Sequence, residues 1–198
     1  MGASEKDTTA TKVLAAYDAL VAEAEPRAGA LREVFQRRTG VFHAEDPWFE
    51  TRSRACWDDA LTTQAFGQTF ARAHRGFFVV SDVDDRGALL LDLWSGAELL
   101  VRHLDETQAL TLQHAEGAID ARVVAAGDPA SLYVLPGAYH HAADALEPSV
   151  DVLAGARDRG METGEALDAL LRMDLVFRAS SRVKASFAYR VESLGRSR

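Results

Sequence analysis

The chain has 198 residues, of which 47% are hydrophobic and 26% are charged, with one cysteine and a formal net charge of −8. This composition is typical of a globular protein, and a single cysteine excludes an internal disulfide and any zinc or iron–sulfur site built on several thiolates. No apolar run reaches the ~20 residues needed to cross a bilayer, no signal-peptide pattern opens the chain, and the acidic charge argues against a general nucleic-acid binder, so we expect a cytoplasmic protein.

The N-terminal part of the sequence predicts a tail followed by helices. Residues 1–11 are small and polar, which is typical of a disordered tail. From Thr11 onward, apolar residues recur with the period of an amphipathic helix, beginning with Val13, Leu14 and Tyr17. Asp46-Pro47 is a helix-start signal farther along the chain. We therefore expect residues 12–75 to form a helical region.

The hydrophobic period changes to that of strands at Gly76. Five short runs of apolar, β-branched or aromatic residues follow, separated by turn residues: Phe77–Val83, Gly87–Trp94, Ala97–Leu104, Ile119–Ala126 and Ser131–Leu135. So many short strands in close succession favour a strongly bent sheet or a barrel over a flat sheet. We predict that residues 76–136 form a small five-stranded antiparallel sheet or barrel.

The helical period returns after Pro136-Gly137. One apolar stripe contains Leu146, Val150, Leu153 and Ala154, and a second contains Leu167, Leu170, Leu171 and Leu175. The segment Val183–Leu194 alternates in part and fits either a strand or a helix. Residues 137–198 are therefore predicted to be mainly helical, and residues 12–198 to be a single α+β domain with N-terminal helices, the β-unit and C-terminal helices.

Asp92 is a candidate functional residue because it lies among leucines. If Ser95 and Gly96 are the central residues of a hairpin turn, Leu91 lies opposite Leu100 and Asp92 faces the apolar side. A carboxylate placed there needs hydrogen-bond donors or a raised pKa. The simpler interpretation is that Asp92 accepts backbone N–H groups of the turn, and the alternative is a catalytic role.

His140 and His141 are the other candidates for a catalytic role. The pair follows Tyr139 in a predicted loop that enters a helix, and we interpret it as helix-start or surface residues near Asp144. A metal site would need partners from elsewhere, such as His43, Glu45, Asp46, His103 or His114, and no His-Glu-x-x-His spacing is present. Cys56 fits a small buried residue better than a nucleophile. The sequence therefore predicts no metal and no cofactor.

One stretch of the β-unit resembles a known module. Asp92-Leu93-Trp94-Ser95-Gly96, then Val101-Arg102, then the run from Gly117 to Val124, is similar to a small β-unit of uncharacterised bacterial proteins, some of which carry a SecC-type zinc knuckle. The resemblance covers residues 76–136 and implies a fold module with no established activity. The knuckle's cysteine cluster is absent from this sequence, and so is the zinc that it would hold.

The C-terminal segment is basic, in contrast to the rest of the chain. Residues 175–198 contain six basic residues and one acidic residue, which gives +5 and leaves −13 for residues 1–174. Three interpretations remain open. The segment could fold onto the acidic body, could bind an acidic protein partner, or could contact nucleic acid with Phe187 and Tyr189 stacking on bases. The candidate partner-binding residues are Arg178, Arg182, Lys184 and Arg190.

Taken together, these patterns favour a non-enzymatic role in protein–protein interaction or assembly, with an acidic protein or a second copy as partner. The support is the absence of a nucleophile–base pair, of metal-ligand spacing and of a cofactor loop. One alternative is an enzyme of unknown class with a polar pocket between the β-unit and the helices, using Asp92 and a histidine such as His103, His140 or His141. The other is a nucleic-acid binder that uses the basic C-terminal segment.

Overall fold

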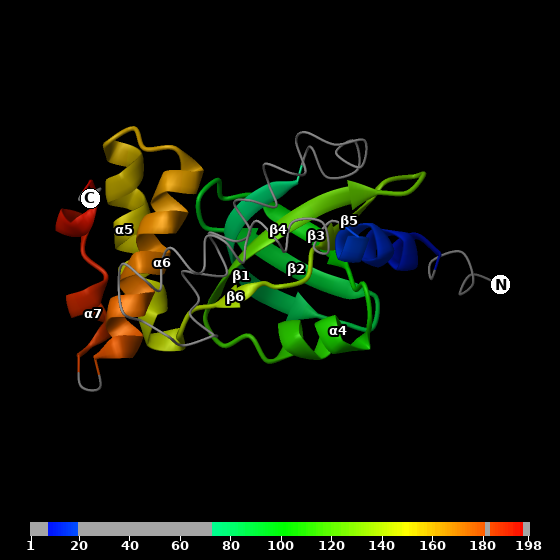
Figure 1. Ribbon diagram of the computed structural model, residues 1–198, viewed down its shortest axis with the longest axis horizontal. Coiled ribbons are helices and arrows are strands. Elements are labelled where there is room, and N and C mark those ends of the chain that lie inside the picture. Colours follow the sequence, from blue (N-terminus) through cyan, green and yellow to red (C-terminus); the bar gives the residue numbers. More distant parts are fainter. Residues whose placement is uncertain (1–7, 20–72, 181–182, 196–198) are drawn as a thin grey trace.

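The computed structural model describes residues 8–19, 73–180 and 183–195 (Figure 1). An N-terminal helix (residues 8–19) comes first, and the helices predicted between residues 20 and 72, with Asp46-Pro47 and Cys56, lie outside the described residues. The strands are β1 (His74–Val83), β2 (Gly87–Asp92), β3 (Glu98–Arg102), β4 (Ala118–Ala126), β5 (Ser131–Val134) and β6 (Tyr139–His140). The remaining helices are α4 (Glu106–Gln113), α5 (Leu146–Asp158), α6 (Thr163–Ala179) and α7 (Ala185–Ala188), with single 3-10 turns at Ala143–Ala145 and Val191–Ser193.

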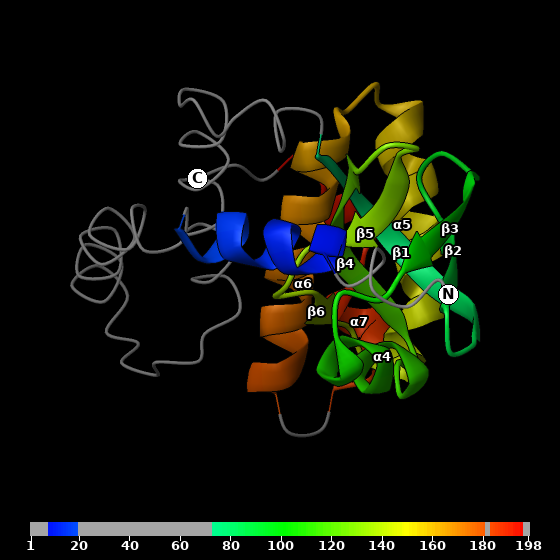
Figure 2. The same cartoon turned by 90° about the vertical axis from the view of Figure 1, so that its right-hand side faces the viewer.

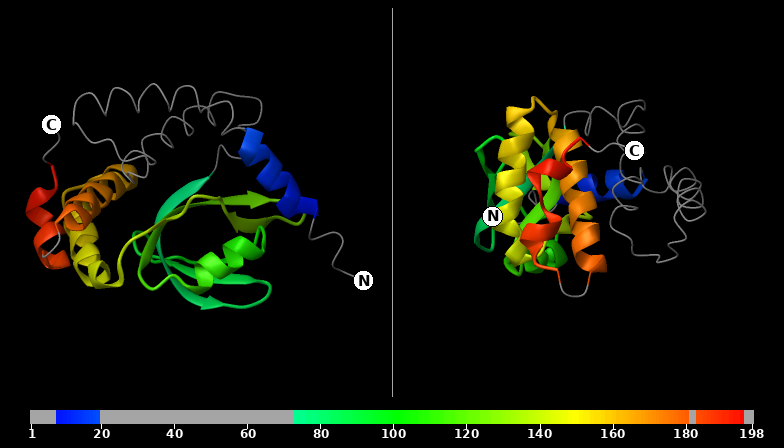
Figure 3. Two further views of the ribbon diagram at one scale, coloured as in Figure 1. Left: turned by 60° about the horizontal axis from the view of Figure 1, so that its bottom comes forward. Right: turned by 90° about the vertical axis from the view of Figure 1, so that its left-hand side faces the viewer.

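Five strands close into a barrel, which confirms the predicted α+β fold. The order is β1-β2-β3-β5-β4, and β4 pairs with β1 to complete the ring (Figure 3, left). This order, with a helix between the third and fourth strands, is the topology of the OB-type barrel. The expectation that all pairs are antiparallel is wrong for β3 and β5, which are parallel. The chain between these two strands includes α4 and β4, and it is long enough for the crossover that a parallel pair requires.

The barrel interior is filled by side chains that point inward from alternate positions along each strand. Phe78, Leu90, Val101 and Ile119 are fully buried there, and α4 packs Leu112 against them. The sequence pattern does not predict α4, because the apolar residues of this helix form no stripe; in the structure Leu110 is 51% exposed. A local start signal was nevertheless present. The carboxylate of Asp105 accepts a hydrogen bond from the backbone N–H of Gln108 at 2.7 Å.

Helices cover two parts of the outer barrel wall. Phe77 and Ala118 pack against α5 and α6, and α7 lies on the far side of these two helices (Figure 3, right). The N-terminal helix covers the wall formed by β4 and β5, where Val13 packs near Val124 and Tyr133 (Figure 2). In the described ranges, no helix is long and apolar enough to cross a membrane.

The structure corrects several predicted boundaries. Residues 8–11 belong to the N-terminal helix and not to a tail, because Ala10 is buried against the barrel. β1 begins at His74, within the region predicted to be helical, because its first residues pair with β4. Val183–Leu194 contains α7 and a 3-10 turn and no strand, because Ala185 and Ala188 pack onto the helical layer.

Candidate functional site

The carboxylate of Asp92 is fully buried and holds the turn between β2 and β3. Oδ1 accepts a hydrogen bond from the backbone N–H of Trp94 at 3.0 Å, and Oδ2 accepts one from the hydroxyl of Ser95 at 2.6 Å. Oδ2 also lies 3.0 Å from Nε2 of His74. The prediction that Asp92 accepts a backbone N–H of the turn is therefore confirmed.

The register of this hairpin differs from the predicted one by two residues. Leu91 lies opposite Glu98 and not opposite Leu100, and Leu89 takes the position opposite Leu100. The connection is longer than a two-residue turn because Asp92 closes it twice: its side chain binds Trp94, and its backbone N–H donates to Ala97 O at 2.9 Å. A shift of two residues preserves which face a side chain occupies, so Asp92 still points to the apolar side.

His74 is a residue that the sequence analysis missed at this position. It comes from β1, 18 residues before Asp92, and its side chain is 47% exposed. A carboxylate that orients a half-exposed imidazole is an arrangement that can support general-base chemistry. Neither of the two cavities described below is lined by His74 or Asp92. The contact between His74 and Asp92 depends on the register of β1 against β2. A single sequence carries no local signal for this register.

His141 belongs to a buried polar group between the barrel and α6, which we call the Asp174 cluster: Tyr139, His141, Asp174, Arg178 and Tyr189. Asp174 is fully buried and accepts hydrogen bonds from the Tyr189 hydroxyl at 2.7 Å, from Nε of Arg178 at 2.5 Å and from the Tyr139 hydroxyl. Nδ1 of His141 lies 2.9 Å from the Tyr189 oxygen. The charge of Asp174 is thus compensated by one cation and two hydroxyl groups.

The protonation state of His141 follows from its neighbours. Burial and the nearby Asp174 carboxylate raise the pKa of Tyr189, so its hydroxyl keeps its proton and donates it to Asp174. His141 must then donate from Nδ1 to the Tyr189 oxygen, which leaves Nε2 unprotonated. Burial lowers the pKa of His141 to about 4, although Asp174 acts in the opposite direction. Nε2 has no hydrogen-bond partner in the described part of the chain, and His141 is therefore a neutral, packed residue.

The interpretation of His140 and His141 as helix-start or surface residues is wrong. His140 lies in β6, and the backbone N–H of His141 continues the pairing by donating to Ala118 O at 2.8 Å. This pairing carries His141 under α6, where only 4% of it is exposed. His140 is half-buried, and its pKa is lowered by burial and by the charge of Arg178.

The other proposed metal partners are not brought together. His43, Glu45 and Asp46 lie outside the described residues, and within residues 8–19, 73–180 and 183–195 no three potential ligands are grouped. Nε2 of His103 lies 2.8 Å from the carbonyl oxygen of Asp84. His114 follows α4 as its C-cap residue.

Part of the basic C-terminal segment makes contacts with the rest of the protein. Arg178 pairs with Asp174 and donates from Nη2 to the carbonyl oxygen of His140 at 2.6 Å. The guanidinium of Arg190 lies over the ring of Phe187, while Lys184 is exposed. Arg182 lies outside the described residues. Ala185, Ala188, Tyr189 and Leu194 belong to the core that α5 and α6 form with the barrel, which is the packing expected if the segment folds onto its own body. A partner role for the basic residues stays a prediction.

An ion pair that the sequence did not indicate connects the barrel to α6. The Arg75 guanidinium makes two hydrogen bonds to Asp120, at 3.0 and 2.6 Å, and one to Asp168 at 2.9 Å. Burial alone would lower the pKa of Arg75, but the two carboxylates raise it above its ordinary value. The available signal was the carboxylate of Asp120 in a strand whose only other charged residue is Arg122.

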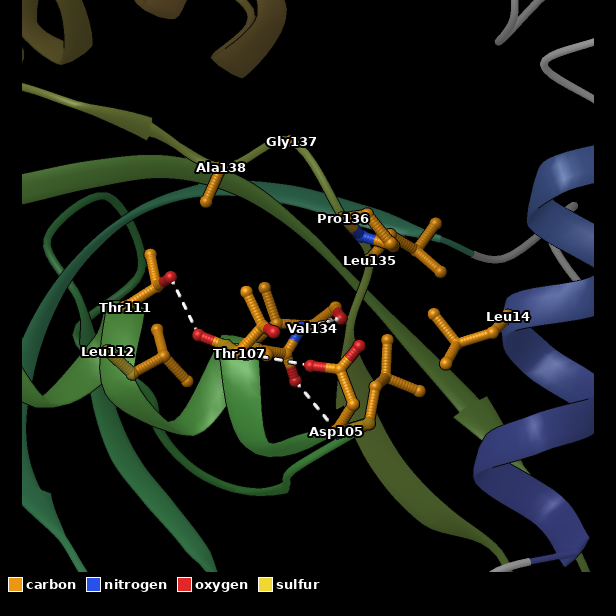
Figure 4. Close-up of a pocket in the computed structure, with 12 residues that line it drawn as sticks. Leu14, Asp105, Thr107, Thr111, Leu112, Val134, Leu135, Pro136, Gly137 and Ala138 are labelled. Atoms are coloured by element: carbon orange, nitrogen blue, oxygen red, sulfur yellow. Dashed lines mark hydrogen bonds between the residues drawn. The ribbon is translucent and has the colours of Figure 1, made fainter.

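Two cavities are open on the barrel. The first, of about 160 Å³, lies between α4, the segment after β5 and the N-terminal helix, with Leu14, Leu112 and Leu135 among its walls (Figure 4). Its central polar side chain, Gln108, is satisfied internally, since it accepts from Leu104 N and donates to Val134 O. The second, of about 490 Å³, lies between the β1–β2 loop, β3 and the start of β5.

Comparison of the chain with protein-family models, with curated proteins and with solved structures gives no match. The resemblance of residues 76–136 to the small β-unit of uncharacterised bacterial proteins, some of which carry a SecC-type zinc knuckle, therefore stays a prediction.

Proposed function

We propose that this protein is a cytoplasmic protein-interaction module that docks a partner protein on the outer face of β2 and β3. The observation that carries the proposal is a group of outward aliphatic side chains, which we call the leucine face: Val79, Leu89, Leu91 and Leu100. In the sheet, Val79 lies opposite Leu91, and Leu89 lies opposite Leu100. Leu100 is 73% exposed.

The position of the leucine face supports a docking role. α5 and α6 cover the wall formed by β1 and β4, and the N-terminal helix covers β4 and β5. Among the described helices, none packs on the outer side of β3. Leu100 is exposed, and Val79, Leu89 and Leu91 are half-buried beside it. A group of aliphatic side chains that water can reach is characteristic of sites where another protein binds, because binding removes this apolar surface from water.

The chemistry of the face favours a protein partner over nucleic acid. OB-type barrels often bind ligands on the face of their second and third strands, but a fold does not by itself determine a function. Binding of single-stranded nucleic acid relies on aromatic side chains that stack on bases. The four residues of the leucine face are all aliphatic.

The enzyme alternative has less support. Both oxygens of Asp92 accept hydrogen bonds within the turn, and His141 is enclosed in the Asp174 cluster. A catalytic group must reach its substrate, and neither cavity that we describe contains Asp92, His140 or His141.

Site-specific photo-crosslinking tests the proposal. The photoreactive residue benzoylphenylalanine replaces Leu100 in the full chain inside living cells, and Leu110, an exposed leucine on α4, serves as the matched control position. We expect one defined protein adduct from position 100 that is absent from position 110. The adduct should weaken strongly when Leu89→Ser and Leu91→Ser are added, because they remove apolar contact beside the probe.

Two outcomes would contradict this function. One is an adduct from position 100 that nuclease removes, which would identify nucleic acid as the partner. The other is equal crosslinking from positions 100 and 110, which would show that the leucine face has no specific partner.

A further inference from the structure

The larger cavity adjoins the leucine face and shares a residue with it. Its walls are Asp84 and Arg86 of the β1–β2 loop, Gly87 of β2, residues 100–102 of β3 and residues 130–132 at the start of β5. Leu100, the most exposed leucine of the docking face, is one of these lining residues. A segment docked on the leucine face would therefore reach this cavity, which we call the arginine hollow.

The arginine hollow contains two cations, Arg86 and Arg102. The guanidinium groups of Arg86 and Arg102 make no hydrogen bond or ion pair within the part of the chain that the structure describes. The one carboxylate of the hollow, Asp84, is engaged by its own loop, because Oδ1 accepts from the backbone N–H groups of Arg86 and Gly87 at 2.7 and 2.9 Å. These hydrogen bonds lower the pKa of Asp84 and keep it charged. The hollow therefore carries one net positive charge on a chain whose net charge is −8.

Gly87 places the two arginines on adjoining parts of the hollow. It lies directly opposite Arg102 in the β2–β3 ladder and follows Arg86 in sequence. A Cβ atom at position 87 would lie 1.9 Å from the carbonyl oxygen of Val101, so a glycine is needed where β2 and β3 approach this closely.

We propose that the arginine hollow binds a carboxylate side chain of the docked protein, so that the partner segment combines leucine-type residues with an acidic residue. This inference rests on the function proposed above and specifies the chemistry of the partner. The planar guanidinium forms paired hydrogen bonds with a carboxylate, which makes two unpartnered arginines a fitting receptor. A nucleic-acid backbone fits less well, because its successive phosphates require an extended basic surface, whereas here Asp84 lies beside the arginines and aliphatic residues continue from them.

Titration of the ¹⁵N-labelled full chain with defined probes, followed by NMR, tests the inference. The probes are the peptide acetyl-Leu-Glu-Leu-Glu-Leu-amide, its counterpart with glutamine in place of glutamate, and a ten-nucleotide oligothymidylate. We expect the glutamate peptide to shift the Nε–Hε signals of Arg86 and Arg102 and to bind about tenfold more tightly than the glutamine peptide, since charge-assisted hydrogen bonds are lost in the latter.

Paired variants locate this preference. Arg86→Gln with Arg102→Gln should abolish the difference between the two peptides. The fold should be unchanged, because neither side chain makes a hydrogen bond or ion pair with the described residues. Arg172→Gln with Arg190→Gln removes the same charge from exposed positions on α6 and after α7, and it should preserve the difference. Because Arg190 belongs to the basic C-terminal segment, this variant also tests that residue as an alternative anion site.

The outcomes separate this inference from the proposed function. Equal binding of both peptides, with shifts on the leucine face, would overturn the carboxylate site and leave the docking face intact. A preference for glutamate that Leu89→Ser with Leu91→Ser does not weaken would support the hollow and contradict the docking face. Stronger binding of oligothymidylate, or no shift of the two arginine signals by any probe, would overturn the inference.

Discussion

Protonation of His141 is expected to destabilise the fold as the pH falls below neutrality. The pKa of His141 is about 4 in the folded protein, against an ordinary value of 6.5. Between these values the unfolded chain binds a proton that the folded chain does not, so the free energy of unfolding decreases by up to about 1.4 kcal/mol per pH unit. The stabilisation is complete above pH 6.5 and lost by about pH 4, a total of about 3 kcal/mol. The side chain is 1% exposed, so solvent screens this effect little.

Guanidinium unfolding at pH 7, 6, 5 and 4, followed by circular dichroism, measures this effect. His141→Phe keeps an aromatic ring beside Phe77 and Tyr139 but cannot be protonated. The original chain should lose about 3 kcal/mol more than this variant between pH 7 and pH 4. His114→Gln, at an exposed histidine after α4, is the control and should follow the original chain. Parallel loss of stability in the original chain and His141→Phe would refute the reasoning.

Substitutions at three carboxylates test the turn after β2 and the ion pair between the barrel and α6. The free energy of unfolding of each variant is measured by denaturant unfolding. Asp92→Asn should lower the free energy of unfolding by about 1–2 kcal/mol and leave a folded protein, since the amide keeps one acceptor for Trp94 N–H; unchanged stability would show that the turn does not need the charge. Asp120→Ala should cost about 3 kcal/mol or more, because it leaves the buried Arg75 without its main partner. Asp168→Ala should cost less than about 1 kcal/mol, because that side chain is 46% exposed; equal losses at both positions would contradict this division.

The strands were predictable because their signals are local. Each of the five runs is bounded by turn residues, and the first break shows why: the Asp84 carboxylate binds the backbone N–H groups of Arg86 and Gly87. The closure of the barrel was not predictable. It depends on β1 pairing with β4, where Phe78 lies opposite Ile119, and on the parallel contact of β3 with β5. Partner choice at such sequence separations is decided by the packing of the whole domain, and no local pattern encodes it.

The difference between local and long-range contacts also decides which site residues could be predicted from the sequence. The role of Asp92 in its turn was predictable because the two groups that donate hydrogen bonds to it lie two and three residues away. The Asp174 cluster was not, because Tyr139, Asp174 and Tyr189 come from a strand, a helix and the segment after another helix. A usable signal was nonetheless present. Asp174 is a carboxylate near the apolar stripe of the second predicted C-terminal helix, and a charge in that position requires a buried partner.

Closure of the barrel also limits how a second protein molecule can pair with its strands. Each of the five barrel strands has a strand on both sides. In an open sheet, an edge strand has unpaired backbone N–H and C=O groups. With an exposed leucine beside them, such an edge could pair with strands of other molecules and promote fibre growth. In this barrel the strand edge beside Leu100 is short: β3 pairs with β5 only through Val101 and Arg102, so among the described residues the backbone of β3 lacks a second strand partner only at residues 98–100. So short an edge is a poor template for repeated strand addition, and a partner bound at Leu100 would make most of its contacts with side chains.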